Sequence, residues 1–349
     1  MERDHVIDIA KGLGEILVCI GHSKFKTNYE LKLIYQFHMP LFFILSGMMI
    51  NIEKYSILKF IKKKMETILF SYYTISFYSL FNSIVQNNNF NYKKYFFQTL
   101  QGKQEGKNYW FIHSLFISQC LTFIFLKLIS YISKNKIIRN LLIFILLIIS
   151  NYYGYIYGTK KKVYYNLNLT LLIMSYITAG FIIRLNRTFF NKFFFNIFLT
   201  PIYFYYYLKN IPKNSAVGFN LGLLGKPYYS NLIAYLGFFF ILSVSNFIQS
   251  NNILEYFGKN SLYTFFIHVE NKNYFDNLTL FLNNFIPKMI NPYYRHLILL
   301  LINITLILMK TSIYIQIFKI YFPWFLNFSY FYKYKMKKLS NNEIDKITN

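Results

Sequence analysis

Long apolar runs separated by short polar segments make up most of the chain, without the stripes of an amphipathic helix or the alternation of a strand. A membrane-spanning helix needs roughly 20 mostly apolar residues, and closed barrels alternate over about 10 residues, so the runs favour helices. The pattern therefore predicts an all-α, polytopic bundle of about ten transmembrane helices. We expect them near 7–22, 34–50, 67–85, 110–129, 137–157, 163–183, 193–208, 230–248, 253–270 and 297–325.

Residues 1–332 are predicted to form one integral membrane domain, followed by a basic cytoplasmic tail over 333–349. The stretch 271–296 leaves a re-entrant piece open. An even number of spans puts both termini on one side, and the lysines of 54–64 and of the tail favour the cytoplasm. We find no repeat, linker or appended soluble domain, so any chemistry falls to the bundle and its short loops.

Composition supports the membrane interpretation, since 55% of the residues are hydrophobic, with 40 Phe and 34 Tyr. The formal charge of +25 comes from lysine clusters between apolar segments, which favours anionic lipid over nucleic acid as the partner. Compositional drift explains part of that excess equally well. Cys19 and Cys120 lie in apolar surroundings and suggest neither a disulfide framework nor a thiolate metal site.

Ionisable residues interrupt the first apolar run, where a charge near the bilayer centre costs at least a few kcal/mol. At about 100° per residue, Asp8, Lys11, Glu15 and His22 fall within an arc of about 60° on one helix face. Lys11 and His22 are close to three turns apart, about 16 Å along the axis. We expect this polar stripe to line a cavity or to pack against other helices.

The alternative is local pairing of Asp8, Lys11 and Glu15 near the headgroups, at spacings of three and four residues. We expect that local pairing for Glu15, whereas Lys11 and His22 are better explained by function.

A second histidine is placed to meet His22. In "FHMPLFF", Pro40 is predicted at the first helical position of the second span, with His38 at its mouth. His22 and His38 then share one membrane face, where backbone N–H groups favour an anion. Zinc is a weaker interpretation, because no third ligand has a convincing spacing.

The segments "IDIAKGLGEILVCIGHS" and "FHMPLFFILSG" resemble the opening of the acyltransferase-3 family of integral membrane acyltransferases, particularly its fucose 4-O-acetylase-like branch. Weaker matches are "NYWFIHSLF", "LGLLGKPYYSNLIAYLGFF" and "LEYFGKNSLYTFFIH". The resemblance implies O-acetyl transfer from acetyl-CoA, through the membrane, to a hydroxyl of an envelope or surface polysaccharide. It makes His22 catalytic and Lys11 essential, and it implies a multi-pass protein of the cytoplasmic (inner) membrane.

The chemistry of these side chains is compatible with O-acetyl transfer. A neutral imidazole at His22 could accept the proton of a sugar hydroxyl, or it could carry the acyl group itself, and the sequence leaves both open. Lys11 could neutralise phosphate of the donor, and Asp8, one turn away, could orient Lys11. Asp8, Lys11, His22 and His38 are therefore the candidate catalytic residues.

The chain departs from the family pattern after the second span. The family commonly has two basic residues three apart and then a proline, where this chain has "KKKMETILFS", with Thr67 and Ser71 in place of the second base and the proline. Lys62, Lys63 and Lys64 are then the candidates, with Lys11, for holding the acyl-CoA donor.

Two other functions fit a polytopic bundle. A saccharide transporter or flippase would use the stripe as a translocation path, although no internal repeat supports it. A structural or signalling subunit would leave the buried charges unexplained. Lesser candidates are Ser46 and Gly47 for close helix packing, Trp110 as an interface anchor, and His113 and His268, either of which could face the site.

Overall fold

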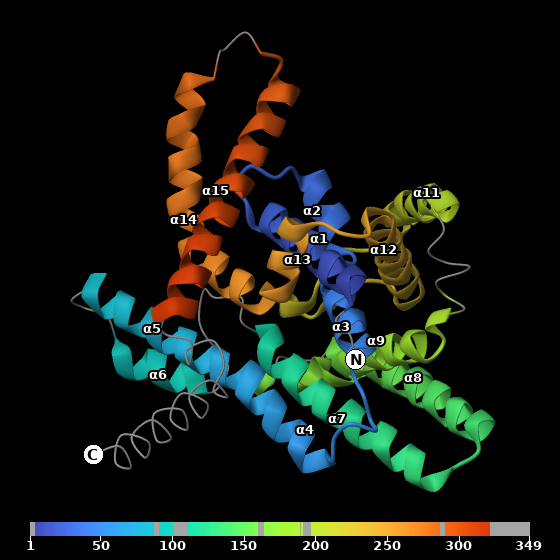
Figure 1. Ribbon diagram of the computed structural model, residues 1–349. Helices are drawn as coiled ribbons and strands as arrows, with labels where there is room; N and C mark the ends of the chain where they lie inside the picture. The colour runs from blue at the N-terminus through green and yellow to red at the C-terminus, as the bar shows by residue number, and fades with distance from the viewer. Residues whose placement is uncertain are drawn as a thin grey trace, which may run out of the picture.

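The computed structural model describes residues 4–86, 91–100, 110–159, 164–188, 190, 197–286 and 290–321. Almost all of them are helical; the strands among them are one antiparallel pair, β1 (Val217–Gly218) and β2 (Leu223–Leu224). The all-α prediction is confirmed. The α-helices are α1 (His5–His22), α2 (Asn28–Tyr35), α3 (His38–Met48), α4 (Ile57–Lys64), α5 (Phe70–Gln86), α6 (Tyr92–Leu100), α7 (Trp110–Ile132), α8 (Lys136–Gly158), α9 (Thr170–Leu185), α11 (Thr200–Asn210), α12 (Pro227–Ile248), α13 (Asn252–Lys259), α14 (Ser261–Leu282) and α15 (Pro292–Tyr321) (Figure 1).

Several helical segments could cross a bilayer by length and composition, and the chain is a multi-pass membrane protein. In the described chain there are six of them: Asn28–Met48, Trp110–Ile132, Lys136–Gly158, Asn166–Leu185, Pro227–Ile248 and Pro292–Tyr321. Helix α1 is apolar along most of its length, but its 18 residues include three that are charged, Asp8, Lys11 and Glu15. The total of about ten spans stays a prediction.

The C-terminal part differs most from the expected spans. The single span expected at 253–270 is two helices that meet at Asn260, which caps the end of α13 and precedes α14. Helix α14 continues to Leu282, and α15 begins at Pro292, so much of the segment 271–296 is regular helix rather than a re-entrant piece. The span expected at 193–208 falls partly outside the described residues, and the tail 333–349 falls wholly outside them.

Helix α1 lies in the middle of the bundle, against α3, α12, α13 and α14 (Figure 1). It crosses α13 closely because each helix has a glycine at the contact. Gly12 faces the backbone of Leu254, and Gly258 faces the backbone carbonyl of Asp8, so a Cβ at either glycine would overlap main-chain atoms. Gly47 of α3 meets the backbone of α9 in the same way, as the sequence suggested.

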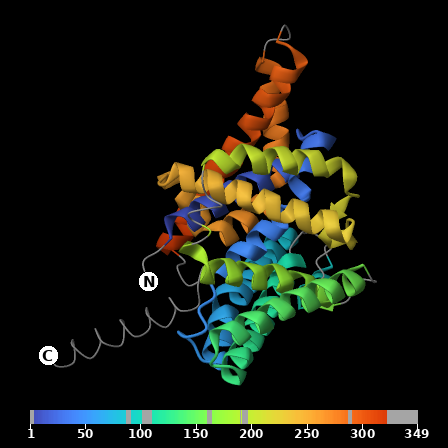
Figure 2. The ribbon, with the colours of Figure 1, turned by 90° about the vertical axis from the view of Figure 1, so that its right-hand side faces the viewer.

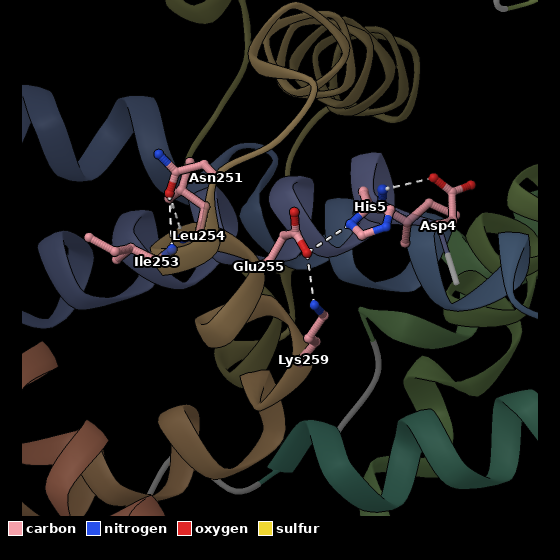
Figure 3. Close-up of polar contacts among 8 residues, drawn as sticks. Asp4, His5, Asn251, Ile253, Leu254, Glu255 and Lys259 are labelled. Atoms are coloured by element: carbon pink, nitrogen blue, oxygen red, sulfur yellow. Dashed lines mark hydrogen bonds and ion pairs between the residues drawn. The ribbon is translucent and has the colours of Figure 1, made fainter. Parts of the chain in front are cut away.

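Polar contacts fix the start of α1 against α13 (Figure 3). Oε2 of Glu255 lies 2.8 Å from Nδ1 of His5 and 2.8 Å from Nζ of Lys259. The hydrogen bond from Lys259, and then that from His5, hold the pKa of the Glu255 carboxyl at about 2. Asp4 caps α1 and also pairs with Arg187. These contacts set the axial position of α1, and therefore the height of its polar stripe.

Helices α14 and α15 form a long antiparallel hairpin that stands out from the rest of the molecule (Figures 1 and 2). Fully buried polar groups lie between the two helices. The amide of Asn303 donates to Oγ1 of Thr279 at 3.0 Å and to Oδ1 of Asp276 at 3.4 Å. The first half of the hairpin packs against α1, which brings His268 to the polar stripe.

Candidate active site

The C-terminal end of α1 borders a cavity formed by segments distant in sequence. Helices α1, α2, α3, α7 and α14 contribute to its wall, and so does the short strand β1. Two histidines and several aromatic rings line it. Its lining includes His22, Tyr35, His38, Trp110, Phe219 and Phe265.

His22 is joined directly to His268. Nδ1 of His22 lies 2.9 Å from Nε2 of His268, and Nδ1 of His268 lies 3.1 Å from the carbonyl oxygen of Thr264. A carbonyl only accepts, so Nδ1 of His268 carries the proton, and the Nε2 of neutral His268 accepts from His22. His22 must then be protonated at Nδ1. The basic nitrogen of neutral His22 is therefore Nε2.

His38 lines the same cavity, so the structure brings together the two histidines singled out in the sequence. Its Nδ1 lies 3.0 Å from the carbonyl oxygen of Ile34, which assigns the proton to Nδ1 and the lone pair to Nε2. The ring packs against Tyr35, with centroids 5.0 Å apart. The predicted helix start is wrong by two residues, because α3 begins at His38 and Pro40 is its third residue. Proline is tolerated there, since first-turn N–H groups have no partner within the helix.

Lysines mark the other end of the α1 stripe. Lys11 lies about three turns before His22 on the same face. Lys64, at the end of α4, is close enough to Lys11 and Lys63 for their positive charges to repel its own. Lys62 and Lys63 are exposed, whereas Lys64 is partly buried. Of these three residues of α4, the structure directs only Lys64 toward α1.

Lys63 has a different partner. Its Nζ donates to the hydroxyl of Tyr55 at 2.7 Å and lies 4.7 Å from the centre of that ring. The same hydrogen bond lowers the pKa of Tyr55. Lys63 therefore braces the loop before α4.

The family model described as an acyltransferase domain matches residues 4–309. The chain belongs to the acyltransferase-3 family. The match begins at the N-cap of α1 and ends within α15, so it covers every helix that lines the cavity. The protein is thus a membrane acyltransferase. No curated protein and no solved structure matches the chain.

The acyltransferase departs from its family pattern at a wide helical turn that the sequence did not reveal. Met65–Leu69 is a π-helix, directly after Lys64 and before α5. Thr67 donates its hydroxyl to the carbonyl of Lys63 at 2.9 Å, and Ser71 donates to the carbonyl of Thr67 at 3.1 Å. Residues that looked like lost functional groups thus bond to the backbone around the irregular turn.

Asp8 and Glu15 complete the stripe, and both are buried, at 4% and 3% exposure. Asp8 lies at the crossing with α13, and its role in orienting Lys11 stays a prediction. The local pairing expected for Glu15 is wrong: no hydrogen bond or ion pair joins it to any residue in the described part of the chain. The spacing rule failed because packing against neighbouring helices places this carboxyl inside the bundle.

The remaining differences between the site expected from the sequence and the observed site concern aromatic residues and His113. Trp110 lines the cavity and stacks on Phe219, with centroids 6.1 Å apart, so it is not a simple interface anchor. His113 is buried with its ring 4.4 Å from that of Tyr72, and it is not among the cavity-lining residues. Phe219 was missed because it lies in a short 3₁₀ turn, Phe219–Leu221, and such a turn in a long connection carries no sequence signal of its own.

Within the described ranges, no group of three His, Cys, Asp or Glu side chains is arranged to hold a metal ion. His22 and His38 give this cavity two imidazoles whose tautomers are assigned by their hydrogen bonds.

Proposed function

We propose that this acyltransferase moves an acetyl group from acetyl-CoA to a hydroxyl of an envelope or surface polysaccharide, as in the fucose 4-O-acetylase-like branch of its family. The observation that carries the proposal is the hydrogen-bonded chain from Thr264 through His268 to His22, because it assigns a basic nitrogen to a residue of the cavity wall. A sugar hydroxyl is a poor nucleophile at neutral pH and needs such a base.

In the proposed reaction, Nε2 of His22 accepts the hydroxyl proton as the sugar oxygen attacks the carbonyl carbon of the thioester. The new C–O bond forms, the C–S bond breaks, and the proton passes from His22 to the departing thiolate. His268 stabilises the positive charge that His22 acquires, since it accepts a hydrogen bond from Nδ1 throughout. Transfer through an acyl-imidazole on Nε2 would use the same nitrogen as nucleophile, with a second base for the hydroxyl.

His38 supplies that second base or a positioning contact. With its Nδ1 proton donated to Ile34, neutral His38 presents Nε2 as an acceptor and has no proton for an oxyanion. We therefore assign to His38 the acceptance of a hydrogen bond from a sugar hydroxyl, while the preference of the backbone N–H groups at this helix start for an anion stays a prediction.

Lys11 and Lys64 form the proposed donor end. Two ammonium groups close enough to repel one another are stabilised by an anion between them, and phosphate of acetyl-CoA is such an anion. The rise of about 16 Å from Lys11 to His22 then separates the phosphate end of the donor from its thioester.

The orientation in the membrane follows from these assignments. The lysines of α4 lie at the same end of α1 as Lys11, and basic segments favour the cytoplasm, where acetyl-CoA is made. We place both termini on that side of the cytoplasmic membrane, with the His22 end of α1 toward the glycan.

The test compares envelope glycans from a deletion strain carrying wild-type protein, His22→Ala or His296→Ala. His296 is a matched control, because its Nε2 pairs with Oε1 of Glu30 at a distance of 3.2 Å and its side chain does not line the cavity. We expect His22→Ala to accumulate normally and to lose about 10²-fold or more of the activity, because a general base contributes about that much. Mass spectrometry should show the loss of about 42 mass units for each acetyl group.

Acetylation that persists undiminished in His22→Ala would overturn the proposal. Glycan export that fails in the deletion strain, with acetylation of the remaining glycan intact, would point to the transporter alternative, which neither the fold nor the family match supports.

A further inference from the structure

One buried carboxyl has no part in the mechanism above. Glu15 is 3% exposed, and its Oε2 has no hydrogen-bond partner among the residues that the structure describes. A buried polar atom without a partner costs about 1–3 kcal/mol, and more when it is charged. Such groups are rare in folded proteins, and each one calls for an explanation.

The neighbours of Glu15 on α1 exclude a structural ion pair. Lys11 is one turn before it, yet the ion pairs of the described chain do not include Glu15. Cys19, one turn after it, is fully buried and packs against Ile307 of α15. The carboxyl therefore stabilises no contact that the fold needs.

Its position on the helix is informative. Glu15 lies about 40° around the axis from Lys11 and about 20° from His22, so all three share one face. Along the axis it stands about 6 Å from Lys11 and about 10 Å from His22. Val18, one turn further toward His22, lines the cavity. Glu15 thus lies between the proposed phosphate end and the reacting end of the donor.

We propose that Glu15 binds an amide of the pantetheine arm of the acyl-CoA donor. The inference rests on the proposed function, because it needs a thioester donor extended along the α1 stripe. The arm carries two amides between its phosphate end and its sulfur, and these are the polar groups that pass the level of Glu15.

The chemistry of the two groups matches. A neutral carboxylic acid has one O–H donor and one carbonyl acceptor, and an amide has one carbonyl acceptor and one N–H donor. The neutral form is the one that fits, because an ionised carboxylate without a cation costs far more to bury. Binding of the arm would supply the hydrogen-bond partner that Oε2 lacks in the described chain.

The test uses purified protein in lipid nanodiscs and two ligands. One is CoA, and the other is adenosine 3′,5′-bisphosphate, which retains phosphates of CoA but lacks the amide arm. We expect Glu15→Met to weaken CoA binding about tenfold, the loss of about one hydrogen bond, and to leave binding of the bisphosphate unchanged. Glu15→Gln keeps a donor and an acceptor, so CoA binding should fall less than threefold.

Lys11→Met is the matched variant on the same face of α1 and should weaken the binding of both ligands. Glu15→Met should unfold at the same temperature as wild type or higher, because it removes an unpartnered buried polar atom. CoA binding unchanged in Glu15→Met overturns the inference. Equal weakening of both ligands also overturns it, since the effect is then on the fold. If wild-type protein binds no CoA at all, it is the proposed function that fails.

Discussion

Two groups of hydrogen-bonded side chains inside the bundle differ in how their hydrogen bonds are connected: one group is closed on itself, and the other runs in one direction. Between α8 and α12, the amides of Asn151 and Asn231 bond to each other in both directions, at 3.1 and 3.0 Å. Ser175 and Tyr176 of α9 complete this amide cluster, each at 3.1 Å. The donors and acceptors are used within the cluster, although both amides border a largely apolar cavity.

The chain from Thr264 through His268 to His22 has a direction instead. The Nδ1 proton of His22 is donated to Nε2 of His268, and that of His268 to the carbonyl of Thr264, while His22 itself lies in the cavity wall. A closed network holds helices together, while a directed one fixes which nitrogen is basic. Substitutions in the two networks separate these two roles.

The largest effect is expected at His268. In His268→Phe, no acceptor holds the Nδ1 proton of His22, so the tautomer and the orientation of His22 are lost. We expect kcat to fall about 10²-fold with little change in the KM for donor, because a positioned general base contributes about 10²-fold or more and His22 loses that position.

His268→Gln gives the matched variant, since a side-chain amide oxygen could accept from His22 in place of Nε2. We expect it to recover a substantial part of the activity. Equal losses in both variants, or a loss in kcat that follows reduced protein accumulation, would show that His268 is only a packing residue.

A smaller effect is expected at the lysine end of α1. Lys64→Met should raise the KM for acetyl-CoA about tenfold with kcat nearly unchanged, because one charge-assisted contact with phosphate is lost. Initial rates at several donor concentrations measure this effect.

Lys62→Met and Lys63→Met serve as controls for that variant, since both side chains are exposed on α4. Each should leave the KM for donor within about twofold of wild type, as expected for solvent-exposed charges. A larger rise in KM for Lys62→Met than for Lys64→Met would place the donor on the outer face of α4.

The smallest effect on activity is expected in the amide cluster. Asn231→Leu leaves polar atoms of Asn151 and Tyr176 without their partner, which should destabilise the fold by about 1–3 kcal/mol and leave kcat per folded molecule unchanged. Thermal unfolding in nanodiscs measures the stability.

The double variant Asn151→Leu with Asn231→Leu should recover part of that stability, because the amides that would otherwise lack a partner are gone. A loss of activity larger than the losses of stability and of protein accumulation explain would mean that the amide cluster has a functional role.

The sequence was sufficient where a rule acts within one helix. The rotation of about 100° per residue placed Lys11, Glu15 and His22 on one face before any neighbour was known. The rule that opposite charges four residues apart pair with each other failed for Glu15, whose expected ion pair does not form. It also missed the π-helix after Lys64, because nothing in "METIL" distinguishes a wide turn from an ordinary one.

Contacts between distant segments were beyond such rules. His268 is 246 residues from His22, and its own helix offers no periodic signal that points it at α1. Lys62, Lys63 and Lys64 are chemically alike, and only the packing of α4 on α7 and its approach to α1 decide which of them turns inward.

By itself, the sequence determined the helical membrane class and the polar stripe on α1 that carries Lys11 and His22, because hydropathy and helical periodicity are local properties. Only the tertiary structure decided which nitrogen of His22 is basic and that Glu15 is buried without a partner in the described chain. The physical reason is that a proton position and a desolvated carboxyl are set by atoms of other helices, brought together only when the bundle packs.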